Sequence, residues 1–209
     1  MPLLKTIQVN ASTKIYVWRI EASFDELSVN IPLTDKSRKR LYSMKSELHQ
    51  RGYLSVRHLL MEAGYTDLDL YYGPNGKPHL KDGKHISITH SFIYSAIAIS
   101  DDEIGIDIEK NREKIKIIQD KFVNFERGYI HEDDCLIQQL TVIWGAKESL
   151  YKIYPYGGLT FKNDIDINSF QISDGKTTGY IKVKNWNKDY EILYDQLDGF
   201  TLVYAIPLL

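Results

Sequence analysis

The order of helical and strand patterns limits the fold most strongly, because the same order occurs twice along the chain. A helical pattern begins at Tyr53 and is followed by strand patterns that end at Ser100. A second helical pattern covers Gln138–Tyr154 and is followed by a series of strands separated by turns. This repeat predicts an α+β fold in which two similar halves, residues 1–103 and 104–209, pack tightly into one functional unit. We expect a pseudo-dimer with the functional site at the junction of the halves.

Finer patterns place individual elements. Alternation in Lys14–Ile20 predicts a strand, with Tyr16, Trp18 and Ile20 on one face. A charged helix is expected over Asp35–Gln50, interrupted at Gly52, before a helix that Gly64 would cap. Further strands are predicted at Ile86–Thr89, Tyr94–Ser100 and Glu103–Ile108. Turns are predicted at Pro74–Pro78, Asp174-Gly175 and Asp198-Gly199, and one long helix over Gln138–Tyr154.

Charge and composition exclude several classes of protein. The net charge of −2 gives no general attraction to nucleic acid or to an acidic membrane, so any anion site must be local. The single cysteine, Cys135, excludes an internal disulfide and a multi-cysteine zinc site. The longest uncharged run, His85–Ser100, is too short to span a bilayer, and the first residues lack a signal-peptide pattern. We therefore expect a cytoplasmic protein with neither nucleic-acid nor membrane partners.

Two acidic residues in Gly105–Lys110 are candidates for metal binding. In an extended strand Asp107 and Glu109 project from one face, while Ile106 and Ile108 face the core. Two carboxylates so placed repel each other unless a cation lies between them, and hard oxygen ligands suit Mg²⁺. Taken alone, the pattern favours a solvated strand end in an acidic stretch that also includes Asp101, Asp102 and Glu103.

The long helical pattern carries a second charged group. Trp144, Glu148 and Lys152 recur at helical spacing, and Lys147 lies one turn from Tyr151. On spacing alone, this pattern favours an ordinary surface helix with a Glu148–Lys152 ion pair.

Together the two segments resemble a specific family. Gly-Ile-Asp-Ile-Glu at 105–109 is followed, 35 residues after Glu109, by a Trp-x-x-Lys-Glu-x-x-x-Lys motif at 144–152. This pair is similar to the signature of the 4′-phosphopantetheinyl transferases, and the length and two-half layout resemble the larger, surfactin-synthetase-activating class (the Sfp type). Gly76-Lys77-Pro78, Ser87-Ile88-Thr89-His90-Ser91 and Gly157-Gly158-Leu159 also resemble family motifs, although Ser87 and Thr89 replace the usual Asn and Ser. The resemblance covers roughly Arg57 to Leu159.

The resemblance implies a holo-[acyl-carrier-protein] synthase, or 4′-phosphopantetheinyl transferase. Such an enzyme moves the 4′-phosphopantetheine of coenzyme A to a serine of an apo acyl or peptidyl carrier protein and releases adenosine 3′,5′-bisphosphate. Mg²⁺, with Mn²⁺ as a substitute, would be held by Asp107, Glu109 and Glu148. Glu148 would also be the general base and Lys152 a second catalytic residue. With the site formed inside one chain, we expect a monomer.

The resemblance also implies contacts with coenzyme A. His90 would donate to the pyrophosphate, Lys147 and Lys152 would neutralise phosphate charge, and Lys77 and Pro78 would shape a turn near the adenine and ribose. Arg57 would lie near the 3′-phosphate, and a surface arginine on an amphipathic helix is the alternative.

Two other functions remain open from the sequence. Another Mg²⁺-dependent phosphoryl enzyme lacks support, since neither Gly-x-x-x-x-Gly-Lys-Ser/Thr nor Gly-x-Gly-x-x-Gly is present. A non-catalytic relative that binds coenzyme A or carrier proteins is disfavoured by the presence of all three acidic residues and Lys152.

Overall fold

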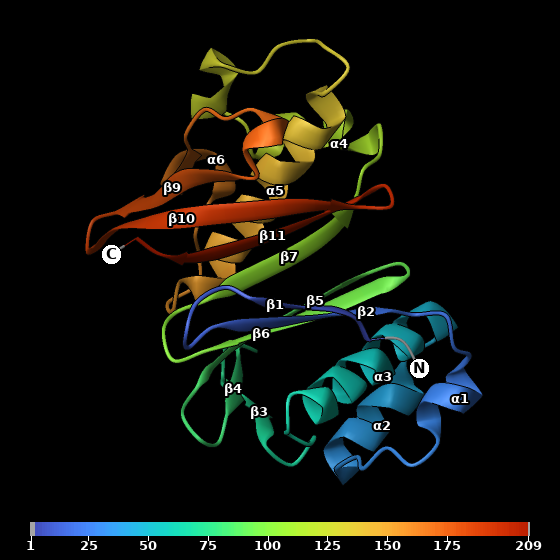
Figure 1. The fold of residues 1–209 in the computed structure, drawn as a ribbon. Coiled ribbons are helices and arrows are strands. Elements are labelled where there is room, and N and C mark those ends of the chain that lie inside the picture. The colour runs from blue at the N-terminus through green and yellow to red at the C-terminus, as the bar shows by residue number, and fades with distance from the viewer. Residues whose placement is uncertain (1–2, 209) are drawn as a thin grey trace. The chain divides into compact units, whose positions relative to one another are not determined.

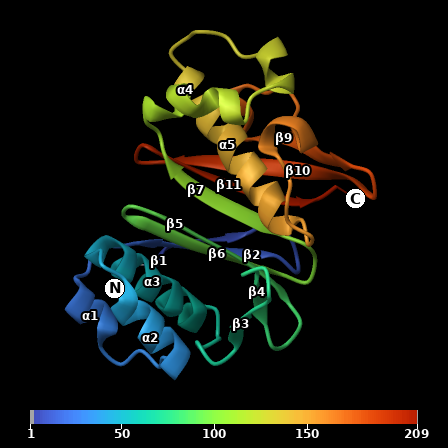
Figure 2. The same ribbon diagram turned by 180° about the vertical axis from the view of Figure 1, so that it is seen from behind.

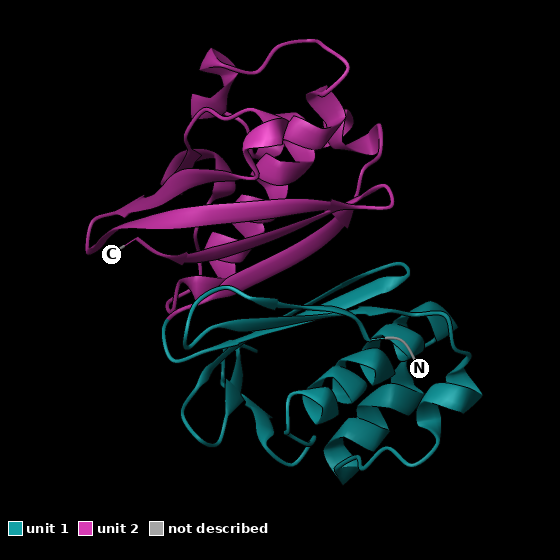
Figure 3. Ribbon diagram, viewed as in Figure 1, with its two compact units in different colours: residues 1–102 teal, residues 103–209 magenta. Residues whose placement is uncertain are grey.

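The chain divides into two compact units in the computed structural model, which describes residues 3–208. The division falls between Asp102 and Glu103. Figure 1 shows the elements and Figure 3 colours the two units. Each unit packs a long helix on an antiparallel sheet, so the combination of helices and sheets in the predicted α+β fold is confirmed.

The first unit is a four-stranded antiparallel sheet with helices against it. The strands lie in the order β1 (Leu3–Gln8), β2 (Lys14–Arg19), β6 (Tyr94–Ser100) and β5 (His85–Ser91). The helices are α1 (Phe24–Ser28), α2 (Asp35–Ser43) and α3 (Glu47–Glu62), and the strands β3 (Leu70–Tyr72) and β4 (Pro78–Leu80) form a separate hairpin. The core lies between α3 and the sheet and includes Trp18, Leu54, Leu59 and Ile97, all of which are buried.

The turns and the strand face predicted for this unit are confirmed, but one helix boundary is wrong. Trp18 and Ile20 lie in the core beside partly buried Tyr16, and Gly64 ends α3 with a positive φ of 84°. The charged helix, however, ends at Ser43, and α3 continues through Gly52, which is buried in its middle. Gly52 does not break the helix, because the packing of α3 on the sheet outweighs the low helix propensity of glycine.

The second unit is a five-stranded antiparallel sheet with one long helix across it. The strands lie in the order β7 (Gly105–Lys110), β11 (Phe200–Pro207), β10 (Trp186–Leu197), β9 (Lys176–Val183) and β8 (Ile165–Ile167). The helices are α4 (Lys114–Ile118), α5 (Leu136–Ile153) and α6 (Phe161–Asp164), with short 3₁₀ turns η1 (Gln119–Lys121), η2 (Phe125–Gly128) and η3 (Ile172–Asp174). Figure 2 shows α5 lying across the sheet beside β7 and β11.

The core of the second unit lies on the α5 side of the sheet. Leu140, Ile143 and Leu150 from α5 pack there with Ile192 and Val203 from the strands. The turn predicted at Asp198-Gly199 is confirmed, with both residues at positive φ.

Both faces of β7 are buried: Ile106 and Ile108 are buried as predicted, and the face of Asp107 also lies against this core. Val203, which is in the core, pairs with Asp107, so Asp107 and Glu109 share the face that α5 covers. Ile106 and Ile108 are buried on the opposite face of the strand and lie outside this core cluster. The carboxylates therefore face the helix that carries the second motif.

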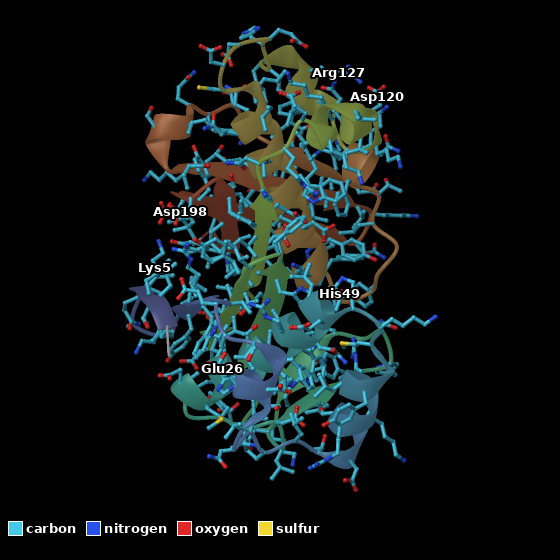
Figure 4. All side chains as sticks on the ribbon, turned by 90° about the vertical axis from the view of Figure 1, so that its right-hand side faces the viewer. Lys5, Glu26, His49, Asp120, Arg127 and Asp198 are labelled. Carbon is cyan, nitrogen blue, oxygen red and sulfur yellow. The ribbon has the colours of Figure 1, made fainter. Side chains whose placement is uncertain are left out.

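The segment between β7 and α5 is held by local polar contacts. Figure 4 labels Asp120 in η1 and Arg127 in η2, whose side chains form an ion pair. Within residues 3–208, no helix is both long enough and apolar enough to cross a membrane.

Candidate active site

Two glycines allow α5 to lie directly on the sheet. A Cβ atom on Gly105 of β7 would stand only 2.0 Å from the carbonyl oxygen of Ser149 in α5. A Cβ on Gly145 of α5 would stand 2.7 Å from Val203 Cγ2 and 3.7 Å from Asp107 Oδ2. Because any side chain at these positions would separate helix and strand, the two glycines set the distance between the two charged motifs.

This close packing brings Asp107 and Lys152 together. Asp107 is only 5% exposed, and its Oδ1 lies 2.9 Å from Lys152 Nζ. Lys152 also donates a 2.7 Å hydrogen bond to the carbonyl oxygen of Ile106. The lysine thus binds both the side chain and the backbone of β7, and the Glu148–Lys152 pair considered from spacing is replaced by a contact between helix and strand.

Glu148 lies in an acidic and largely desolvated environment. The pKa of Glu148 is raised to about 7, first by burial and next by the Asp107 carboxylate, while Lys152 opposes the rise and Glu109 adds a smaller increase. A carboxyl group with a pKa near 7 can exchange a proton at neutral pH. The charges of Asp107, Glu109 and Lys152 therefore all act on Glu148.

The donor set fits a hard divalent cation. Asp107, Glu109 and Glu148 offer only carboxylate oxygens, and the repulsion that raises the pKa of Glu148 would be relieved by a cation. Within residues 3–208, however, no three acidic, histidine or cysteine side chains already stand close enough to form a metal site. Holding one ion with all three carboxylates would require the side chains to move closer together.

Lys147 does not face this cluster, which corrects its assignment as a phosphate contact. Its side chain is fully buried and its Nζ lies 2.7 Å from Glu126 Oε1. The same Nζ donates to the carbonyl oxygens of Phe122, at 2.7 Å, and Phe161, at 2.9 Å. Three acceptors use its three protons, and burial lowers its pKa. Lys147 is an internal structural cation.

Arg57 is likewise internal, which corrects its assignment to the 3′-phosphate and also the surface alternative. Its side chain is 3% exposed, and its Nε lies 3.0 Å from Asp67 Oδ1. The guanidinium stacks on Tyr53, with Cζ 3.5 Å from the ring centroid. Asp67 also accepts hydrogen bonds from Thr34 and Ser37, so the pair ties α3 to the start of α2.

The remaining predicted residues lie in the first unit at exposed or partly exposed positions. His90 is exposed near the end of β5 and packs over Gly52, where a Cβ would stand 3.2 Å from His90 Nδ1. Lys77 precedes β4, Pro78 begins it, and the backbone amide of Gly73 donates to the Lys77 carbonyl to close the turn. Gly52 thus gives His90 its place beside α3.

Glu126 is the charged residue that the motif analysis did not single out. It is fully buried, accepts from the backbone amides of Asn124 and Ile167, and pairs with Lys147. A single glutamate in a polar segment gives no periodic signal. The fixed lysine of the second motif could have prompted a search for an acidic partner.

Part of the chain is similar to a known protein family. Residues 103–204 match the family model described as the 4′-phosphopantetheinyl transferase superfamily, a range that contains the carboxylate cluster and spans just under half of the chain. A search of curated proteins found no match. In this range the chain is therefore similar to the 4′-phosphopantetheinyl transferase superfamily.

Proposed function

We propose that the protein transfers the 4′-phosphopantetheine of coenzyme A to a serine hydroxyl of an apo carrier protein. The observation that carries the proposal is the gathering of Asp107, Glu109 and Glu148 against Lys152 inside the range that matches the superfamily, with the pKa of Glu148 raised to about 7. A surface ion pair would not need this burial or the two glycines that bring the helix onto the strand.

The three carboxylates would hold Mg²⁺ or Mn²⁺, which when bound supplies charge neutralisation for a pyrophosphate. Lys152 keeps Asp107 oriented from α5, since it donates to both Asp107 and the neighbouring backbone. It would also contribute positive charge near the phosphates, which a chain with a net charge of −2 must provide locally. Lys147 has no part in this, because its charge is used internally.

The proton of the attacking serine needs an acceptor, because a hydroxyl is a weak nucleophile at neutral pH. Glu148 would accept that proton as the serine oxygen bonds to the β-phosphorus of coenzyme A. The bond from this phosphorus to the bridging oxygen breaks, and adenosine 3′,5′-bisphosphate leaves with the electron pair. The partly buried setting of Glu148 supports this role, since it makes the carboxylate a stronger base than an exposed one.

The first unit would complete the binding of coenzyme A. We propose that His90 donates to the pyrophosphate and that Lys77 and Pro78 shape the turn against the nucleoside. With these contacts inside one chain, the protein would act as a monomer of the Sfp type. We also propose that it acts in the cytoplasm. The positions of His90, exposed near the end of β5, and of Lys77, partly exposed just before β4, are compatible with ligand contact.

A panel of apo carriers tests the proposal. Acyl, peptidyl and aryl carrier proteins are each incubated with the protein, coenzyme A and Mg²⁺, and the intact mass of each carrier is measured. A gain of one phosphopantetheine, with release of adenosine 3′,5′-bisphosphate, supports transfer. Binding of coenzyme A without a mass gain on any carrier would instead indicate a non-catalytic relative. Turnover of coenzyme A without a carrier would indicate another phosphoryl enzyme.

A further inference from the structure

We propose that the buried Glu126–Lys147 ion pair is a positioning pair, which fixes how α5 presents Glu148 and how Trp144 lines the site beside Glu109. The inference rests on the proposed function for its kinetic consequence, although its structural consequence can be measured without turnover. Among residues 3–208, neither Glu126 nor Lys147 makes a direct contact with Asp107, Glu109 or Glu148. The pair would therefore position the site through the backbone and the side chains that it holds.

The contacts of Lys147 join three separate parts of the second unit. Its ammonium binds the Glu126 carboxylate and the carbonyl oxygens of Phe122 and Phe161 at 2.7 to 2.9 Å. Phe122 precedes η2 and Phe161 begins α6, whereas Lys147 lies in the middle of α5. A single side chain therefore holds two connecting segments against the helix that carries Glu148.

Glu126 extends the same connection to the sheet. Its Oε1 accepts a 3.0 Å hydrogen bond from the Ile167 amide in β8, and its Oε2 accepts a 3.1 Å bond from the Asn124 amide. Both oxygens and all three ammonium protons are thus engaged within residues 122–167. Because every one of these contacts is directional, the pair fixes the rotation of α5 about its axis and its position along that axis relative to the segments around Phe122, Phe161 and Ile167.

The held segments form one wall beside the candidate site. The rings of Phe122 and Phe161 pack on Trp144, with ring centroids 5.2 and 5.3 Å apart. Trp144 lies one helical turn before Glu148 and lines a cavity of about 100 Å³ together with Glu109, Ile115 and Ile118. Displacing the Phe122 or Phe161 backbone would therefore move the wall of a cavity that opens beside a proposed ligand of the metal.

Stability alone does not account for a fully buried pair. Removing both ions from water is costly, and well-packed apolar side chains of similar size often give equal or greater stability. A pair with five directional contacts does specify one arrangement of its neighbours. This difference between stabilising and positioning gives the proposal a direct test.

The test compares four variants of the full chain. Lys147→Met and Glu126→Gln each break the pair, whereas the double variant Glu126→Leu/Lys147→Met removes both charges and should regain stability. Lys182→Met is the matched control, since it breaks the Asp166–Lys182 pair, in which the carboxylate is also buried. Unfolding in urea, kcat and KM for coenzyme A, and the ¹⁹F spectrum of protein labelled with 5-fluorotryptophan are measured for each. Trp144→Phe assigns the Trp144 resonance among the three tryptophans.

A positioning role predicts that stability and function separate. The double variant should recover the urea midpoint, yet keep a shifted Trp144 resonance and a kcat/KM about a hundredfold below wild type, as expected for misplacement of about 1 Å. Lys182→Met should lose stability with little change in kcat. Normal kinetics and a normal Trp144 resonance in the double variant would overturn the proposal. Should the double variant stay unstable, Lys147→Met showing the same kinetics as Lys182→Met would overturn it.

Failure of the positioning role can be distinguished from failure of the proposed transfer activity. If the wild-type protein modifies no carrier, the transfer proposal fails, while the Trp144 resonance still reports whether the pair sets the wall. An unchanged resonance in Lys147→Met and Glu126→Gln would then refute the positioning pair by itself.

Discussion

Lys152 Nζ lies 2.9 Å from Asp107 Oδ1 and, at the same time, 2.7 Å from the carbonyl oxygen of Ile106. This double contact links the last turn of α5 to β7 at Asp107, the first carboxylate of the segment Gly105–Lys110, and at the residue before it. The only cation of the second motif that reaches the acidic cluster within the described residues is therefore Lys152, since Lys147 is held elsewhere. The lysine balances part of the negative charge around Glu148.

Replacing Lys152 by Met should raise the pKa of Glu148 above its value of about 7, because Lys152 opposes the effects of burial and of Asp107. The measurement is a ¹³C carboxyl NMR titration in EDTA, with Glu148→Gln to assign the resonance. Lys152→Arg keeps the charge and should leave the pKa close to that of the wild type. A lower pKa in Lys152→Met would contradict the electrostatic account of the cluster.

The free energy of unfolding of the metal-free protein should depend on pH through the titration of Glu148. Its folded pKa of about 7 exceeds the ordinary value of 4.5, so between these pH values the folded state binds more protons than the unfolded state. The free energy of unfolding from this group therefore falls as pH rises from about 4.5 to 7, by roughly 3 kcal/mol at most. Urea denaturation in EDTA should show a shallower fall in Glu148→Gln. Identical pH profiles for the two proteins would be inconsistent with a shifted Glu148.

Gly105→Ala should separate α5 from β7, because the new Cβ would stand 2.0 Å from the Ser149 carbonyl oxygen, a backbone atom. We expect a loss of roughly 1–3 kcal/mol or more in the free energy of unfolding, together with loss of activity. Gly128→Ala is the matched control, since its Cβ meets nothing within 4 Å. Equal behaviour of the two variants in denaturation and in carrier modification would argue against close packing as the origin of the site.

Arg57→Met should act on stability rather than on coenzyme A. It leaves the Asp67 carboxylate, whose side chain is 2% exposed, without its cation, and breaking a buried pair in this way costs about 3–5 kcal/mol. KM should change equally little for coenzyme A and for 3′-dephospho-coenzyme A in the folded fraction. A rise in KM for coenzyme A alone would restore the sequence-based assignment of Arg57 to the 3′-phosphate.

Local sequence patterns predicted the elements well where periodicity and turn residues agreed. The long helix was expected over Gln138–Tyr154 and runs from Leu136 to Ile153, and the strand from Tyr94 to Ser100 has the expected ends. The interruption predicted at Gly52 is wrong, because glycine usually weakens a helix, whereas here its missing side chain makes room for His90.

The site was predictable only in part, because a motif shows which residues share a helix or strand but not which buried partners they meet. The spacing placed Glu148 and Lys152 near each other on α5. The structure shows in addition that Lys152 pairs with Asp107 of β7, where the helix packs on the sheet. For Lys147 and Arg57 the acidic partners lie 21 and 10 residues away, in segments without periodic signals. Formal charge at such positions does not distinguish an internal ion pair from a ligand contact.

The most direct test of the central claim is the intact mass of an apo carrier over time with wild type and with Glu148→Gln, at saturating coenzyme A and Mg²⁺. The variant keeps the shape and one oxygen ligand but loses almost all basicity. The account predicts phosphopantetheine addition by the wild type and a kcat lower by about 10²–10⁴ in Glu148→Gln that added Mg²⁺ does not restore. Turnover by the variant near that of the wild type at high Mg²⁺ would contradict the role of Glu148 as the base. Addition by neither protein to any carrier would contradict the transfer itself.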